Sequence, residues 1–142
     1  MKTLIIFYSY SGKTKEIAEN LAKEKSADII EVKEMTVRSK IKAYSIGCLA
    51  AMQRKMVDLQ PFNSDLTAYE KIIIAMPIWA GYPAPAINNI IHVLPKGKMI
   101  ELIMTSGSGN SKKSEAGTKA LIEAQGCHVV SYRDMKGMSQ NE

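Results

Sequence analysis

The most distinctive stretch of the sequence is a hydroxyl-rich turn near its start. Residues 9–14 read SYSGKT and lie between the apolar run 3–9 and a stripe of apolar residues at helical spacing. A helix that begins near Gly12 would direct unpaired backbone N–H groups and the positive end of its dipole at this turn. The turn therefore predicts a pocket for one phosphate group, and a simple helix cap is the alternative. Its aliphatic hydroxyls, which add neutral donors, belong to Ser9, Ser11 and Thr14.

The letters SGKT also invite comparison with the triphosphate-binding P-loop. That motif needs a glycine five positions before its Gly-Lys-Thr, and this chain has Phe7 there. A bulky aromatic residue at that place is incompatible with the wide backbone cradle. The dinucleotide fingerprint requires three glycines, whereas this turn has Gly12 alone. Both interpretations are therefore excluded.

A second unusual stretch, AMPIWAGYPAP at 75–85, follows the strongest strand pattern of the chain. It carries the single tryptophan, Trp79, with Tyr82 three positions later and the permissive Gly81 between them. Its three prolines stiffen the backbone. A rigid loop that presents aromatic faces suits stacking against a flat ring, and a core or interface role for Trp79 is the alternative.

A third stretch, TSGSGN at 105–110, follows the next strand pattern. Its glycines, hydroxyls and amide allow close backbone approach and neutral hydrogen bonds to a ligand. In an open parallel sheet, loops at the carboxyl ends of strands share one edge, where ligands bind. A phosphate pocket, an aromatic platform and a polar glycine loop on one edge predict a site for a planar heterocycle with one phosphate. That description fits flavin mononucleotide (FMN).

Strand and helix patterns alternate along the whole chain, as the positioning of these loops requires. Continuous apolar strands separated by helices predict a doubly wound α/β fold, with a five-stranded parallel sheet covered on both faces. We expect one domain over residues 1–142, without repeats or linkers. The predicted strands cover 3–9, 27–34, 69–78, 98–106 and 127–133, and the predicted helices start near residue 12 and cover 41–55, 84–94 and 111–126.

Composition narrows the class of protein. No apolar run approaches the roughly 18 residues needed to span a bilayer, and the start of the chain lacks a signal-peptide pattern, so we expect a cytoplasmic protein away from membranes. The net charge is +5, and the basic segment 33–55 is either a solvated helix face or a patch for an anionic ligand or acidic partner. It lacks interleaved aromatics, so nucleic acid is not expected. Cys48 and Cys127 are expected to be buried, reduced thiols, and no spacing indicates a metal site.

These motifs resemble those of the flavodoxin-like family, in its FMN-binding flavoprotein oxidoreductase branch. SYSGKT is similar to the family's phosphate signature after the first strand, and PIWAGYPAPAI (77–87) is similar to its loop after the third strand. The resemblance covers residues 3 to about 133 and implies the strand order 2-1-3-4-5. It implies phosphate contacts from Ser9, Tyr10, Ser11, Gly12, Lys13 and Thr14; contacts along the isoalloxazine from Pro77, Ile78, Trp79, Ala80, Gly81 and Tyr82; and contacts at its pyrimidine edge from Thr105, Ser106, Gly107 and Gly109.

Two departures from the family pattern bear on function. Electron-carrying flavodoxins are typically acidic, whereas this chain is basic. The family also usually ends in a fifth helix, but only DMKGMSQNE (134–142) follows the last predicted strand, which is too short and polar for a full helix. One sheet face would then be partly bare, and we expect a homodimer or another partner to cover it.

The sequence therefore predicts an FMN-dependent oxidoreductase whose electron donor is NAD(P)H or a redox partner protein. No side chain is identified as a catalytic acid or base, and flavin chemistry does not require one. An electron-carrier module without its own substrate is the first alternative. A flavin-free interaction protein on the same fold is the second.

Overall fold

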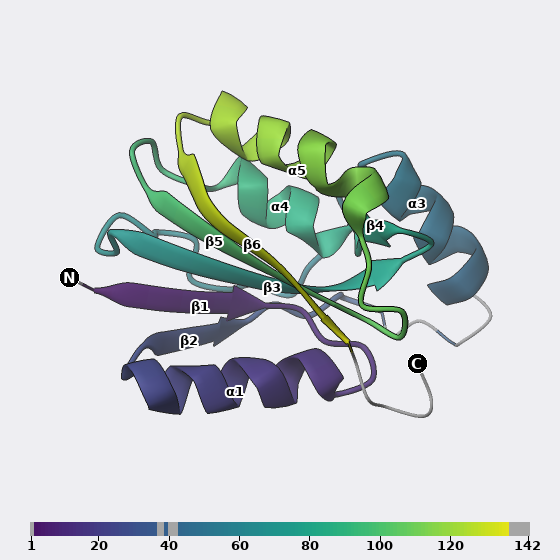
Figure 1. Cartoon of the computed structure of the whole chain (residues 1–142), viewed down its shortest axis with the longest axis horizontal. Helices are drawn as coiled ribbons and strands as arrows, with labels where there is room; N and C mark the ends of the chain where they lie inside the picture. Colours follow the sequence, from purple (N-terminus) through teal and green to yellow (C-terminus); the bar gives the residue numbers. More distant parts are fainter. Residues whose placement is uncertain (1, 37–38, 40–42, 137–142) are drawn as a thin grey trace.

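The computed structural model describes residues 2–36, 39 and 43–136 and shows an open, twisted parallel sheet (Figure 1). The strands lie side by side in the order β2-β1-β3-β5-β6, which is the predicted order 2-1-3-4-5. A short β4 (Tyr82–Pro83) pairs antiparallel with the end of β3. The parallel strands are β1 (Thr3–Phe7), β2 (Asp28–Glu31), β3 (Lys71–Trp79), β5 (Met99–Ser106) and β6 (His128–Lys136).

Helices cover the sheet from both faces. Helix α1 lies on one face, α4 and α5 lie on the other, and α3 lies beyond the carboxyl end of β3 (Figure 1). Such layering needs crossover connections between parallel strands, and the predicted helices supply them. The helices are α1 (Lys13–Lys25), α3 (Cys48–Met52), α4 (Ala86–His92) and α5 (Lys112–Ala124), and a π-helical turn η1 (Ala43–Gly47) leads into α3.

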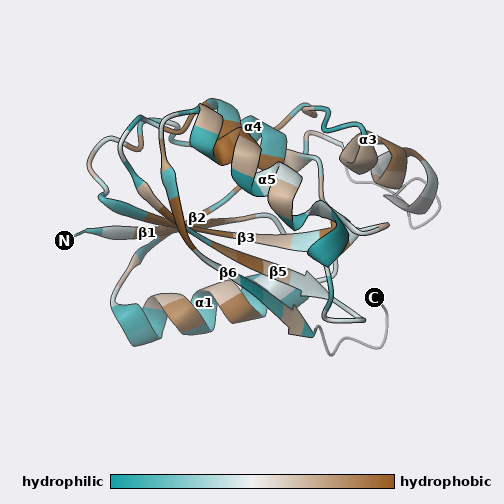
Figure 2. Cartoon of the chain, turned by 45° about the horizontal axis from the view of Figure 1, so that its top comes forward, coloured by the Kyte–Doolittle hydropathy of each residue, from teal (hydrophilic) through white to brown (hydrophobic). Residues whose placement is uncertain are grey.

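The central strand β3 shows why the sheet is apolar on both sides. Its alternate residues Ile72 and Ile74 join the core under α4 and α5, whereas Ile73 and Ala75 join the core under α1. All four side chains are fully buried. Figure 2 shows the hydrophobic colour concentrated along the central strands. The continuous isoleucine run of this strand is thus explained by burial on two faces.

Several element boundaries differ from the sequence prediction; β2, for example, ends at Glu31, before the predicted end at residue 34. The helix predicted over 41–55 is η1 followed by the short α3, and residues 41 and 42 lie outside the described part. Strand β3 continues to Trp79 because Trp79 pairs with Tyr82. Strand β6 continues to Lys136, beyond the predicted end, because Lys136 and its neighbour pair with the end of β5.

The α1 face is only partly covered by helices in the described residues. Helix α1 packs against β1, β2 and β3. Over β5 and β6 this face instead carries Glu101, whose Oε2 lies 2.7 Å from Nζ of Lys71, and the exposed Arg133. Asp134, Met135 and Lys136, which the sequence analysis placed after the last strand, belong to β6.

Candidate functional site

The hydroxyl-rich turn forms the entrance to α1. Gly12 is the N-cap residue and has a φ of 101°, a backbone conformation that favours glycine. The N–H of Glu16 donates the first α-helical bond to the Gly12 carbonyl, at 3.1 Å. The amides before Glu16 therefore lie at the end of the helix, where its dipole attracts an anion.

The side chains of this turn organise its own amides. Ser9 Oγ accepts a hydrogen bond from the Gly12 amide at 3.1 Å, and Ser11 Oγ accepts one from the Lys13 amide at 3.5 Å. Gly12 as N-cap supplies no side-chain cap, so the turn differs from an ordinary Ser/Thr-capped start. Amides, hydroxyls and the half-buried Lys13 ammonium form a donor set whose chemistry fits a phosphate.

Two contacts join the three predicted loops at one edge of the sheet. Thr14 Oγ1 lies 2.8 Å from Thr105 Oγ1, and both threonines are buried, which joins the first loop to the third. The rings of Tyr10 and Trp79 meet edge to face, with centroids 5.9 Å apart and an interplanar angle of 88°, which joins the first loop to the second. The predicted convergence of these loops is therefore observed.

The second stretch, predicted as a rigid loop over 75–85, contains a tight hairpin. Pro77, Ile78 and Trp79 belong to β3, and Trp79 pairs directly with Tyr82 of β4. The two residues of the turn, Ala80 and Gly81, have φ values of 53° and 88°. Positive φ at both positions is characteristic of a type I′ turn, which matches the twist of the strands that it connects. This geometry supplies the rigidity that the prolines had suggested.

The two aromatic residues of the hairpin have different surroundings. Trp79 packs edge to face with Tyr10 of the first loop and with Tyr8, which precedes that loop, and both pairs of ring centroids are 5.9 Å apart. The ring of Tyr82 instead packs against two cations, with Arg54 at 5.2 Å and Lys113 at 5.4 Å from its centroid. Trp79 therefore groups with the phosphate turn, whereas Tyr82 faces the side of α3 and α5.

The third loop is stabilised by a hydrogen bond within the loop and by hydrogen bonds between Ser111 and β6. Ser106 Oγ accepts a hydrogen bond from the Gly109 amide at 2.9 Å, and Gly109 has a φ of 70°. Behind the loop, Ser111 Oγ donates to Asp134 Oδ1 at 2.5 Å and lies 2.5 Å from the Tyr132 hydroxyl. Burial raises the pKa of Tyr132, and the nearby charge of Asp134 acts in the same direction. Gly107 is exposed at the tip of the loop.

Sequence reasoning missed three residues of this region. Tyr8 supports Trp79, and its hydroxyl donates to Glu34 Oε2 at 2.6 Å. Tyr8 continues the apolar strand pattern, so its type and position resemble those of any core residue. Arg54 approaches Tyr82 from the segment just after α3, and Lys113 approaches it from α5. Both residues are distant from Tyr82 in sequence, and no local pattern predicts these contacts. Burial lowers the pKa of Arg54.

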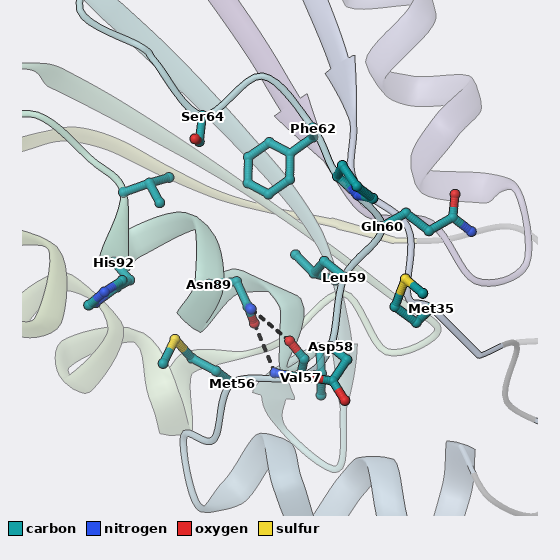
Figure 3. Close-up of a pocket in the computed structure, with 12 residues that line it drawn as sticks. Met35, Met56, Val57, Asp58, Leu59, Gln60, Phe62, Ser64, Asn89 and His92 are labelled. Carbon is teal, nitrogen blue, oxygen red and sulfur yellow. Dashed lines mark hydrogen bonds between the residues drawn. The ribbon is translucent and has the colours of Figure 1, made fainter.

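A separate cavity of about 680 Å³ lies between α4 and the extended segment 56–64 (Figure 3). Two of its lining residues are hydrogen-bonded to each other. The side-chain amide of Asn89 accepts a hydrogen bond from the Val57 N–H at 3.0 Å and donates one to the Val57 carbonyl at 2.7 Å. Its rim includes the exposed Met35 and Met56. None of the predicted site residues lines this cavity, so it is distinct from the three-loop edge.

The described residues hold no group of three or more His, Cys, Asp or Glu side chains placed to bind a metal ion. Cys127 is buried, as predicted, but Cys48 is only partly buried, because α3 lies at the margin of the fold; both are free thiols. Within the same described ranges, no helix has the length and apolar character to cross a membrane.

The fold and the loop edge together define a doubly wound α/β protein whose candidate site lies at the carboxyl ends of its strands. A family model described as Flavodoxin matches residues 2–136. The chain therefore belongs to the flavodoxin family, and this membership supports FMN as the cofactor. A search of curated proteins found no match.

Solved structures give the same result. A flavoprotein from Lactobacillus acidophilus NCFM, crystallised in complex with FMN, is 29% identical, with 94% of this chain and 93% of that chain covered and a TM-score of 0.79. A candidate flavoprotein from Bacteroides uniformis ATCC 8492 is 23% identical, with 99% and 93% covered and a TM-score of 0.81. An apo NADH:FMN oxidoreductase is 20% identical, with 93% and 74% covered and a TM-score of 0.54. The last two show a shared fold alone.

Proposed function

We propose that this protein binds FMN at the three-loop edge and is an oxidoreductase that transfers electrons or hydride through it. The observation that carries the proposal is the meeting of the loops, through the contacts Thr14–Thr105 and Tyr10–Trp79. The FMN complex of the similar L. acidophilus protein supports the identity of the ligand.

Each loop has its own role in this proposal. The turn at 9–14 would hold the phosphate with its hydroxyls, two of which accept hydrogen bonds from the Gly12 and Lys13 amides, with the positive end of α1 and with the Lys13 ammonium. Residues 77–82 would lie along the isoalloxazine, with Trp79 as its aromatic neighbour, and Thr105, Ser106, Gly107 and Gly109 would border the pyrimidine edge. When bound, FMN would supply the electron or hydride transfer, and the protein would bind and orient it.

The electron donor is proposed to be NAD(P)H or a redox partner protein. The positive net charge favours an anionic donor over the positively charged partners of acidic flavodoxins. We place the protein in the cytoplasm, and its two free thiols are consistent with a reducing compartment. A homodimer is also part of the proposal, because the α1 face carries no described helix over β5 and β6.

An absorption spectrum of the purified protein with added FMN tests the proposal. We expect a protein-bound flavin spectrum that bleaches when NADH or NADPH is added without any other protein. Binding without bleaching would favour the electron carrier, in which case a reductase should restore bleaching. Protein that leaves FMN free in an equilibrium dialysis experiment would contradict the proposal and favour the flavin-free interaction protein.

A further inference from the structure

Arg54 has a backbone conformation that is unusual for its residue type. It follows the last turn of α3 with a φ of 56°, in the left-handed region. Its amide donates to the Ala51 carbonyl at 3.2 Å, and the Lys55 amide donates to the Ala50 carbonyl at 3.0 Å. These two bonds form a Schellman motif, in which glycine is the usual residue at the position of Arg54. An arginine in this strained place suggests that its side chain is needed there.

The side chain of Arg54 connects α3 to two other elements. Its Nη1 donates to Thr118 Oγ1 at 2.6 Å, and its Nη2 donates to the Ser114 carbonyl at 3.1 Å, so both bonds reach α5. The guanidinium also lies over the ring of Tyr82, 5.2 Å from its centroid. The planar guanidinium can make these contacts together, whereas a lysine ammonium has no such fork. Arg54 therefore joins α3, α5 and the β3–β4 hairpin.

Helix α5 has space for this guanidinium because residue 117 is glycine. A Cβ atom at Gly117 would lie 2.8 Å from Arg54 Nη2, which is too close for an undisturbed contact. Gly117 is inside a helix, where glycine is unfavourable, and its backbone does not require glycine through a positive φ. The close approach of Arg54 supplies the reason for a glycine at this position.

The contacts continue from Arg54 to the phosphate turn. Tyr82 pairs with Trp79 across the hairpin, and Trp79 contacts the ring of Tyr10. We propose that Arg54 is a positioning residue for the FMN site, which fixes the β3–β4 hairpin against α5 and thereby sets the place of Trp79. This inference rests on the proposed FMN binding and adds to it a residue outside the three loops.

Equilibrium titration with FMN tests the positioning role. Arg54→Gly removes the side chain and retains a residue that favours the left-handed backbone, so α3 should end as before. We expect its Kd for FMN to rise about tenfold, because the variant loses a partly buried cation–π contact with Tyr82 and the hydrogen bonds that link this contact to α5. The matched control is Lys113→Met, which removes the other cation over Tyr82; its Kd should change by about twofold at most. Arg54→Lys should give an intermediate Kd.

A second measurement tests the contact between Arg54 and Gly117 without FMN. Gly117→Ala should strengthen α5 in the Arg54→Gly background, but in the wild-type background it should also displace the guanidinium. We expect its increase in Tm to be larger in the Arg54→Gly background by about 3 °C. Equal shifts in both backgrounds would show that the contact is absent.

The outcomes separate the two proposals. Wild-type protein that does not bind FMN would overturn the proposed function, and with it the positioning role. Wild-type protein that binds FMN, together with an unchanged Kd for Arg54→Gly, would overturn the positioning role alone. A raised Kd for Arg54→Gly, a near-normal Kd for Lys113→Met and unequal shifts for Gly117→Ala would support it.

Discussion

At the scale of single residues, Trp79 connects the hairpin to the phosphate turn. Its partly buried ring meets Tyr8 and Tyr10 edge to face. Trp79→Ala should weaken FMN binding by roughly tenfold, because an aromatic contact of this kind is worth about 0.5–1.5 kcal/mol. Flavin fluorescence titration measures the Kd, and far-ultraviolet circular dichroism should show an unchanged fold. Trp79→Phe retains an aromatic face and is the control. Unchanged affinity of Trp79→Ala for FMN would show that the Trp79 ring does not contact the flavin.

Tyr132 has a predicted pH dependence. Burial raises its pKa, the charges of Asp134 and Glu115 raise it further, and hydrogen bonds with Ser111 and Ser114 oppose the shift. A pKa raised in the folded state gives stability that is present below the ordinary tyrosine pKa of about 10 and is lost as the pH rises through the folded value. The free energy of unfolding should therefore fall in this alkaline range, and less so in Tyr132→Phe. An identical alkaline profile for both proteins would contradict this.

The pair Thr14–Thr105 is a buried hydrogen bond that joins two of the loops. Thr14→Val should destabilise the protein by about 1–2 kcal/mol, because it leaves the Thr105 hydroxyl buried without this partner. The double variant Thr14→Val with Thr105→Val replaces both hydroxyls by methyl groups of similar shape and should recover most of that loss. Denaturant unfolding measures both values. Simple additivity of the two substitutions would contradict a direct interaction.

At the scale of elements, the turn of the β3–β4 hairpin contains a backbone conformation that is unfavourable for its alanine, and a substitution should relieve it. Ala80 is exposed and has a φ of 53° in the first central position of the turn, where asparagine is preferred before glycine. Ala80→Asn should stabilise the fold by about 0.5–1 kcal/mol. The matched control is Ala116→Asn on an exposed position of α5, which should destabilise by up to about 0.7 kcal/mol. Thermal unfolding distinguishes the two signs, and a destabilising Ala80→Asn would argue against this turn type.

The periodicity of apolar residues explains which helices and strands could be predicted from the sequence. The isoleucine run of β3 and the apolar stripe of α1 indicate their own structures, because burial on two faces or on one imposes those periods. The hairpin and the extension of β6 have no such local signal. Both depend on backbone pairing with a partner strand, Trp79 with Tyr82 and Lys136 with Ser106. Pairing partners are chosen by the tertiary fold rather than by the residues of the strand itself.

At the scale of the whole molecule, the distribution of exposed apolar side chains bears on association. Five of the eight exposed large apolar residues in the described chain lie between residues 35 and 56, and Ile46, Leu49 and Met52 follow one another at three-residue spacing around α3. The α1 face of β5 and β6 instead carries Glu101, which is paired with Lys71 of β3, and Arg133. The predicted homodimer could therefore form through α3 as well as through the α1 face of the sheet.

Light scattering tests the predicted homodimer. We expect twice the monomer mass of 15.7 kDa at micromolar concentration. Leu49→Lys should dissociate a dimer formed through α3, whereas Val130→Lys should dissociate one formed at the edge strand β6, where Val130 is also exposed. Each variant is the control for the other. A monomeric wild-type protein would contradict the prediction, and the single-domain organisation can be tested in parallel by the cooperativity of its unfolding.

The sequence alone determined the layered α/β fold, the strand order through its family resemblance, and the three loops that meet at one edge. These properties follow from local periods and from short motifs whose residues are neighbours in the chain. Only the tertiary structure decided that Trp79 lies with Tyr8 and Tyr10, that Tyr82 packs against Arg54 and Lys113, and that Gly117 makes room for the Arg54 guanidinium. Those contacts join residues far apart in sequence, and no pattern within one segment specifies which side chain another segment will bring to it.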